Sequence, residues 1–333
     1  MDRFKHVIGM PHFKFIPPAV LLFSLPMLQQ AGLLTGSFVF AIGTTLIYSI
    51  MAIGFAFLLG YAGLASLGTA GFVGVGAYIA YFAVEVYGLP FSAALLITLL
   101  VSGLLGVIVG FISLRIEGIY LALLTLGLSE ILRNTFLSLK ATIKINLNSL
   151  KLFGNTVGEQ EIYFVIAAIL IVLLMITTNL INSPIGRALV SVKNSPSAAQ
   201  AMGISLVKYR VLAFAVCTMY AAIAGLLYMM YVRNITASSS PLFTVLTSLN
   251  ILGAVVIGGA KSLWGTMFGV FLIYGVQSGF FSKIPFFVQN PAFITMITGA
   301  LIVVIVMYYP GGLAQMALRI KRKIKSKSAE KAV

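Results

Sequence analysis

Long apolar segments alternate with short polar ones along most of the chain. A helix that crosses a membrane needs about 20 predominantly apolar residues, because each residue advances the helix axis by about 1.5 Å. The pattern therefore predicts an all-α polytopic membrane protein with about ten transmembrane helices. The expected spans are residues 15–34, 37–59, 62–87, 90–113, 117–139, 161–180, 211–232, 243–260, 263–282 and 290–309. They form a transmembrane domain at 15–310, flanked by an N-terminal segment at 1–14 and a tail at 311–333.

One polar stretch, residues 183–210, interrupts this pattern, with basic residues and no acidic ones. It contains two Ser-Pro pairs, and serine as N-cap followed by proline at the first helical position is a typical helix start. A glycine further along is a typical helix end. The pattern predicts two short helices outside the bilayer: residues 184–193 after Ser183-Pro184, and residues 196–202 after Ser195-Pro196 and before Gly203.

The first of these short helices is expected to be amphipathic. Its apolar residues recur at the i, i+3, i+4 and i+7 positions that form one helix face. They are Ile185, Ala188, Leu189 and Val192, whereas Arg187, Ser191 and Asn194 lie largely away from that face. A small amphipathic platform beside a membrane domain suits a docking surface for a partner, but an ordinary surface loop would show the same spacing.

Two further stretches are rich in glycine. Residues 60–78 contain six glycines and residues 253–269 contain five, one stretch on either side of the 183–210 loop. Glycine lets helix backbones pack closely in a membrane, and it also permits broken helices. Corresponding glycine-interrupted segments in two halves indicate a transporter with internal repeats and a central site. We expect such a pseudo-repeat, although close helix packing alone would give the same composition.

The composition excludes a soluble protein, because only 9% of the residues are charged and 60% are hydrophobic. Soluble domains carry about 25% charged residues. The net charge of +15 does not indicate nucleic-acid binding, since seven of the 22 Lys and Arg residues lie at 319–331, directly after an apolar run. Such a basic tail is typical of the cytoplasmic side of a membrane and of contact with its lipids.

Charge also suggests the orientation. With the N-terminus inside, about ten crossings return the C-terminus to the same side. Both termini and the 183–210 loop are then cytoplasmic in a plasma-membrane protein, and the polar segment at 140–160 faces outward, where a soluble partner could meet it.

Candidate catalytic and cofactor chemistry is sparse. The single cysteine, Cys217, excludes an intrachain disulfide and a thiolate metal cluster, and His6 and His12 cannot form a metal site alone. The string Gly259-Ala260-Lys261-Ser262 resembles the end of a phosphate-binding loop, but that motif needs glycine directly before the lysine and again five residues earlier. We therefore expect no cofactor and no enzymatic activity, and any ATP hydrolysis must come from another chain.

Several polar residues fall inside predicted spans. Glu130 lies about 20 Å along its span, where an ionisable group indicates a functional site by default, yet Arg133 at i+3 can form a structural ion pair with it. Glu130 is one candidate for lining a translocation path, and Ser66, Thr69 and Asn250 are better ones, because such a path should offer weak polar contacts. Each of these three could equally form a hydrogen bond between helices.

Four ordered motifs resemble the permease subunit of bacterial branched-chain amino acid ABC importers. They are GYAGLASLGTAGFVGVGAY (60–78), LRIEGIYLALLTLGLSEILR (114–133), SPIGRALVSVKNSPSAAQAMGISLVKYR (183–210) and SLNILGAVVIGGAKSLWGTMFG (248–269). The resemblance covers about residues 37–310. At Thr69 the chain differs from the family, which often has His or Gln there; threonine keeps a hydrogen-bonding group but lacks the imidazole or amide.

The resemblance implies a type II importer architecture and a role for the 183–210 loop as the coupling segment that docks on an ATPase subunit. The implied docking residues are Gly186, Arg187, Ala188, Asn194, Ser195, Ala198, Ala199, Met202 and Gly203. Its two clean caps and small residues favour the second short helix as the part that enters the ATPase groove. The implied partners are ATPase subunits, a second and usually different permease subunit, an extracytoplasmic substrate-binding protein and an amino acid substrate.

The expected function is thus ATP-driven import of branched-chain amino acids. Two alternatives stay open at this point. One is a permease of the same architecture for a sugar, a nucleoside, urea or an amide. The other is an ion-coupled secondary transporter in which Glu130 acts as an ion relay.

Overall fold

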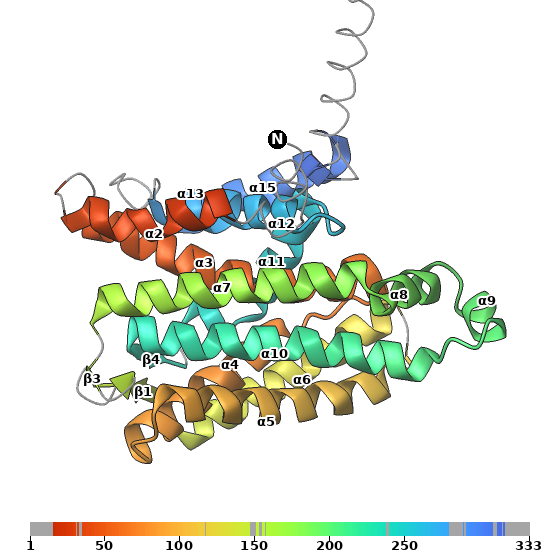
Figure 1. The fold of residues 1–333 in the computed structure, drawn as a ribbon, viewed down its shortest axis with the longest axis horizontal. Helices are drawn as coiled ribbons and strands as arrows, with labels where there is room; N and C mark the ends of the chain where they lie inside the picture. The colour runs from red at the N-terminus through yellow and green to blue at the C-terminus, as the bar shows by residue number, and fades with distance from the viewer. Residues whose placement is uncertain are drawn as a thin grey trace, which may run out of the picture.

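The computed structural model describes residues 16–308, except 31, 33–34, 117, 147–150, 153–154, 157, 238–239, 280–288 and 290, and then residues 312–314 and 316. The predicted N-terminal segment with His6 and His12, and the basic residues at 319–331, lie outside the described residues. The described part is a bundle of helices with short strands at one end (Figure 1).

The helices are α2 (Ile16–Gln30), α3 (Gly36–Phe57), η2 (Leu58–Ala62), α4 (Thr69–Ala80), η3 (Tyr81–Val86), α5 (Phe91–Ile112), α6 (Ile119–Leu139), α7 (Glu159–Asn182), α8 (Pro184–Asn194), α9 (Pro196–Ala201), α10 (Leu206–Val232), η5 (Pro241–Phe243), α11 (Val245–Gly258), α12 (Leu263–Val270), η6 (Phe271–Gly275), α13 (Val276–Gly279) and α15 (Pro291–Tyr308). The strands are β1 (Thr142–Lys144), β2 (Lys151–Leu152), β3 (Asn155–Thr156) and β4 (Asn234–Thr236).

Every predicted span contains a helix, and in the described residues five of these helices are long and apolar enough to cross a membrane. They are Gly36–Ala62, Thr69–Val86, Phe91–Ile112, Gln160–Asn182 and Leu206–Val232. Three further apolar helices are shorter: Val245–Gly258, Leu263–Gly275 and Phe293–Ile305. The chain is therefore mostly helical with several candidate spans, whereas about ten crossings and the pseudo-repeat stay predictions.

The helices differ in how far they are buried. In the most apolar part of α3–η2, 83% of the residues are buried inside the chain, against 33% in α5 and in α7. α3, α4 and α10 thus form the interior, and α5 and α7 keep an apolar outer surface that suits lipid. Glycine permits this interior packing: a Cβ added at Gly76 of α4 would overlap the carbonyl of Ala222 on α10.

The described residues also contain short strands of two or three residues, which the sequence pattern did not predict. β1 and β4 pair antiparallel, with Thr142 opposite Thr236 and Ile143 opposite Ile235. They tie the segment after α6 to the segment after α10 and lie at one end of the bundle, here called the strand end. α8 and α9 lie at the opposite end, here called the loop end (Figure 1).

Candidate functional site

The 183–210 loop forms the two predicted helices with the predicted caps. The Ser183 hydroxyl accepts from the Ile185 amide at 3.1 Å, and the Ser195 hydroxyl accepts from the Ala198 amide at 3.4 Å. Gly203, directly after α9, has a positive φ of 78°, a conformation that glycine adopts without a steric penalty. The sequence therefore placed both helices correctly to within about one residue at each end.

α8 is amphipathic, as predicted, and its apolar face covers the end of α7. Leu189 and Val192 are buried, whereas Arg187 and Asn194 are exposed. Gly186 is buried as well. It lies so close to the last helical turns of α7 that a Cβ at that position would overlap the carbonyl of Ile181. This close contact fixes α8 against the bundle.

The nine implied docking residues divide into two groups by their exposure, and their docking role stays a prediction. Gly186, Ala188 and Ala199 are buried within the chain, with only 3% of Ala199 exposed, so these three support the loop from inside. Five residues are exposed and Ser195 is partly so; the five are Arg187, Asn194, Ala198, Met202 and Gly203. A partner that docks here would therefore touch only the second group.

α9 projects furthest from the bundle at the loop end (Figure 1). The side chains of α9 around Ala198 are small and uncharged. Met202, directly after the helix, is 84% exposed. Small residues allow a partner to approach closely, and an exposed methionine adapts to a groove. The geometry thus agrees with α9 as the docking helix, and that role stays a prediction.

The glycine-rich stretches form two helix reversals at the loop end. Residues 63–68 connect η2 to α4, and residues 259–262 connect α11 to α12. The two reversals touch: the Tyr61 hydroxyl donates to the carbonyl of Lys261 at 2.9 Å, and a Cβ at Gly60 would overlap the carbonyl of Ala260. Both roles considered for these glycines, close packing and helix interruption, are therefore present.

Lys193 joins α8 to the first reversal, and the sequence did not single it out. Its ammonium donates to the carbonyls of Leu59 at 3.1 Å and Gly60 at 2.9 Å. Partial burial, and then the nearby Lys261, lower the pKa of the Lys193 ammonium. The sequence shows a lysine in the last turn of a predicted helix and, far away in the chain, a glycine-rich stretch. It does not show that the two meet.

The polar residues proposed for a translocation path lie in two different places. Ser66 and Thr69 are buried beside the first reversal, where the neighbouring Ala70 amide donates to the Ser248 hydroxyl at 3.0 Å. Asn250 is partly buried and lies within hydrogen-bonding reach of the Tyr274 hydroxyl. Ser66 thus lies in the first reversal and Thr69 at the start of α4, whereas Asn250 lies on α11, two residues after the Ser248 that bonds to Ala70.

Glu130 and Arg133 form the predicted ion pair on α6. The Arg133 guanidinium donates to the Glu130 carboxylate at 2.8 Å, and the two side chains are 26% and 40% exposed, respectively. Since the pair lies within one helix, it balances both charges locally. This arrangement favours the structural interpretation of Glu130 over an ion relay.

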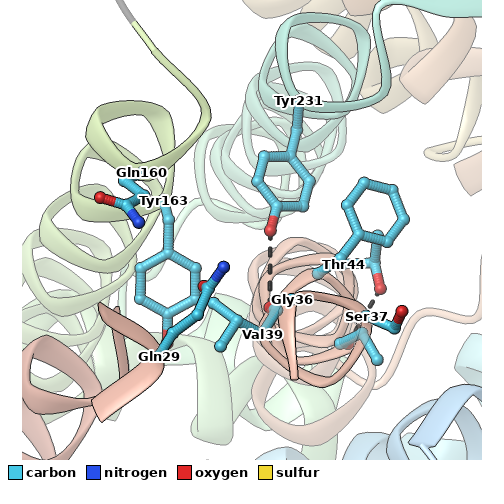
Figure 2. Close-up of a pocket in the computed structure, with 10 residues that line it drawn as sticks. Gln29, Gly36, Ser37, Val39, Thr44, Gln160, Tyr163 and Tyr231 are labelled. Atoms are coloured by element: carbon cyan, nitrogen blue, oxygen red, sulfur yellow. Dashed lines mark hydrogen bonds between the residues drawn. The ribbon is translucent and has the colours of Figure 1, made fainter. Parts of the chain in front are cut away.

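A pocket of about 500 Å³ opens at the strand end, between the end of α2, the start of α3, the start of α7 and the end of α10 (Figure 2). Its walls combine amides and hydroxyls with an aromatic pair, Phe40 stacked on Tyr231 at 5.0 Å. Tyr231 also donates to the carbonyl of Val39 at 3.5 Å. The lining residues are Gln29, Gly36, Ser37, Val39, Phe40, Ala41, Thr44, Gln160, Tyr163 and Tyr231, and none of them is charged.

The family described as "Branched-chain amino acid transport system / permease component" matches residues 37–306. The match covers most of the chain and includes the reversals and the 183–210 loop. The chain belongs to this family of membrane permeases, and it is therefore a polytopic transport component of the branched-chain amino acid ABC importer class.

Curated relatives agree with this assignment. The chain is 28% identical over 315 residues to the "High-affinity branched-chain amino acid transport system permease protein LivM" of Salmonella typhimurium, covering 86% of the chain and 72% of the relative. The protein of that name from Escherichia coli gives the same identity and coverage. A "Probable branched-chain amino acid transport permease protein LivM" of Methanocaldococcus jannaschii is 26% identical over 66% of the chain and 68% of the relative. No solved structure shows a significant match to the chain.

Proposed function

We propose that the chain is the transmembrane permease subunit of an ATP-driven importer that carries branched-chain amino acids across the bacterial plasma membrane. The observation that carries this proposal is the family match over residues 37–306, which spans both reversals and the capped loop. The names of the curated relatives support the same substrate class. ATP hydrolysis belongs to a separate ATPase subunit.

The proposed topology has about ten crossings, both termini in the cytoplasm and a type II importer architecture with an internal pseudo-repeat. The loop end is the cytoplasmic end, because residues 183–210 carry four basic and no acidic residues. The strand end then faces outward, toward a substrate-binding protein. The two glycine-rich reversals, which contact one another at the loop end, are the proposed corresponding parts of the two halves.

The proposed ATPase contact consists of the exposed members of the implied docking set: Arg187, Asn194, Ala198, Met202 and Gly203. Capped, short helices transmit a displacement without bending, and the exposed side chains here are small or adaptable. A second permease subunit completes the path, for which Ser66, Thr69 and Asn250 are the proposed polar contacts. Glu130 is assigned to a structural ion pair instead.

A reconstitution experiment tests the function. The complex is purified through a tag on this chain, its partners are identified by mass spectrometry, and leucine uptake is measured in proteoliposomes with the binding protein and ATP. We expect co-purification of an ATPase and ATP-dependent leucine uptake that excess isoleucine and valine suppress and ribose, a nucleoside or urea does not. Uptake by this chain alone, driven by an ion gradient, would contradict the proposal, as would suppression by ribose.

A further inference from the structure

Lys193 lies in the last turn of α8, and its side chain crosses to a different helix. Its ammonium donates to two consecutive carbonyls of η2, those of Leu59 and Gly60, at 3.1 and 2.9 Å. The stem of the side chain packs on Gly63, since a Cβ added there would lie 2.8 Å from the Lys193 Cγ. One residue of the 183–210 loop thus contacts the end of α3–η2, which is the most buried of the candidate spans.

The end of η2 is a place where a cation is favourable. The last carbonyls of a helix have no following turn to supply amide donors, and the helix dipole makes this end negative. The helix stops at Gly63, whose φ is 74° and whose amide bonds only to the carbonyl of Leu58. Lysine offers three donors on a flexible stem, so Lys193 can satisfy the carbonyls of both Leu59 and Gly60.

The same point is joined to the second reversal. Tyr61, the residue next to Gly60, donates through its hydroxyl to the Lys261 carbonyl at 2.9 Å, and the backbone at Gly60 touches Ala260. The Lys193 side chain as a whole is exposed, but its ammonium is partly buried at the Gly60 carbonyl, and this burial, followed by the nearby Lys261, lowers its pKa.

We propose that Lys193 is a positioning residue: through it, the 183–210 loop holds the helix reversals at residues 63–68 and 259–262 in place. A partner that displaces α8 has to carry the end of η2 along or break the two hydrogen bonds. In the first case the 63–68 reversal with Ser66, the start of α4 at Thr69 and the neighbouring 259–262 reversal move as well. In the second case the loop is uncoupled from both reversals. This inference rests on the proposed function, in which an ATPase docks on α8 and α9.

The test compares Lys193→Met, which keeps most of the stem but removes charge and donors, with Lys193→Arg, which keeps both. Lys208→Met is the matched control, because Lys208 is an exposed lysine of the same 183–210 loop that lies in the first turn of α10 and is not one of the implied docking residues. The purified complex is assayed for co-purified ATPase, for the rate of ATP hydrolysis and for leucine transported per ATP. Hydrogen exchange is followed in parallel at the Gly63 and Leu64 amides, which bond to the Leu58 carbonyl.

We expect Lys193→Met to retain the ATPase, because the exposed docking residues are unchanged. Transport per ATP should fall about tenfold, and exchange at Gly63 and Leu64 should rise about tenfold. Lys193→Arg should recover part of both values, and Lys208→Met should match the wild type. Wild-type transport per ATP together with wild-type exchange in Lys193→Met would overturn the proposal.

The hydrogen-exchange arm separates this inference from the proposed function. If the wild-type complex lacks an ATPase or ATP-driven uptake, the proposed function fails by that result alone. Exchange at Gly63 and Leu64 still reports whether Lys193 fixes the reversal in that case. A loss of ATPase from Lys193→Met alone would overturn the inference, since it would place Lys193 in the docking surface itself.

Discussion

Ala198 and Ala199 are adjacent on α9 and have opposite environments. Ala198 is exposed at the loop end, whereas Ala199 is 3% exposed and packs inside the loop, where its carbonyl accepts from the Ile204 amide at 2.9 Å. At the scale of the residue, the same amino acid therefore has two different roles. One can present a small surface to a partner, and the other holds the short helix in place.

Aspartate substitutions at Ala198 and Ala199 distinguish a residue that contacts the partner from one that packs inside the loop. Ala198→Asp should leave the amount of folded permease unchanged and reduce the co-purified ATPase, because it places a solvated charge in the proposed contact. Ala199→Asp should reduce the folded permease itself, since burying an unpaired carboxylate costs several kcal/mol. Folded permease is measured as the monodisperse fraction after detergent extraction, and ATPase by its band intensity.

Tyr87→Asp is the control for Ala198→Asp, because Tyr87 is exposed in the turn after η3, at the strand end. Equal ATPase recovery in Ala198→Asp and Tyr87→Asp would remove Ala198 from the docking surface. Full yield of folded Ala199→Asp would show that the site is less enclosed than the structure indicates.

α9 is a six-residue helix, too short to be stable through its own propensity. At the scale of the element, its existence depends on Ser195, on Pro196 at the first helical position and on the glycine end at Gly203. The buried Ala199 then anchors one face. Local capping and one tertiary contact together give the loop end a rigid projection.

Removing the cap should loosen α9 without disturbing α8. Ser195→Ala removes the acceptor for the Ala198 amide, and losing a serine N-cap costs about 1 kcal/mol. We expect amide exchange in residues 196–202 to rise about fivefold, with residues 184–192 unchanged. Ser191→Ala is the control, because the Ser191 hydroxyl bonds to the Arg187 carbonyl within α8 and caps no helix end. Equal exchange in Ser195→Ala and Ser191→Ala would show that the cap is dispensable.

The whole molecule has two chemically different ends. The loop end carries α8, α9 and both reversals, and the strand end carries the β1–β4 pair and the uncharged pocket (Figure 1). A membrane between these ends would place one in the cytoplasm and the other outside. The chain has a single cysteine, Cys217, which is buried in α10, so a cysteine-free version requires only one change.

Labelling of single cysteines tests this arrangement. In a Cys217→Ala background expressed without the ATPase, which would otherwise cover the docking residues, Met202→Cys at the loop end should react with a membrane-impermeant maleimide only in inside-out vesicles. Tyr87→Cys at the strand end should react only in intact cells or spheroplasts. Both positions are largely exposed, so accessibility is not limited by packing. Labelling of both from the same side would refute the proposed topology.

The sequence by itself determined the local features of this protein. Helix positions, the amphipathic face of α8 and the caps at Ser183 and Ser195 depend on residues a few positions apart, so periodicity and residue type suffice to predict them. The ordered motifs also led to the family, which the match over residues 37–306 established. Membrane character followed from apolar length alone.

Only the tertiary structure decided which of these residues meet. Lys193 is 134 positions from Leu59, and the β1–β4 pair joins Thr142 to Thr236. Ala198 and Ala199 differ only in which side of α9 faces the bundle. Such contacts depend on how distant segments pack, and no local pattern encodes that packing. The loop end is therefore a sequence-encoded pair of capped helices, whose link to the buried reversals arises from the fold.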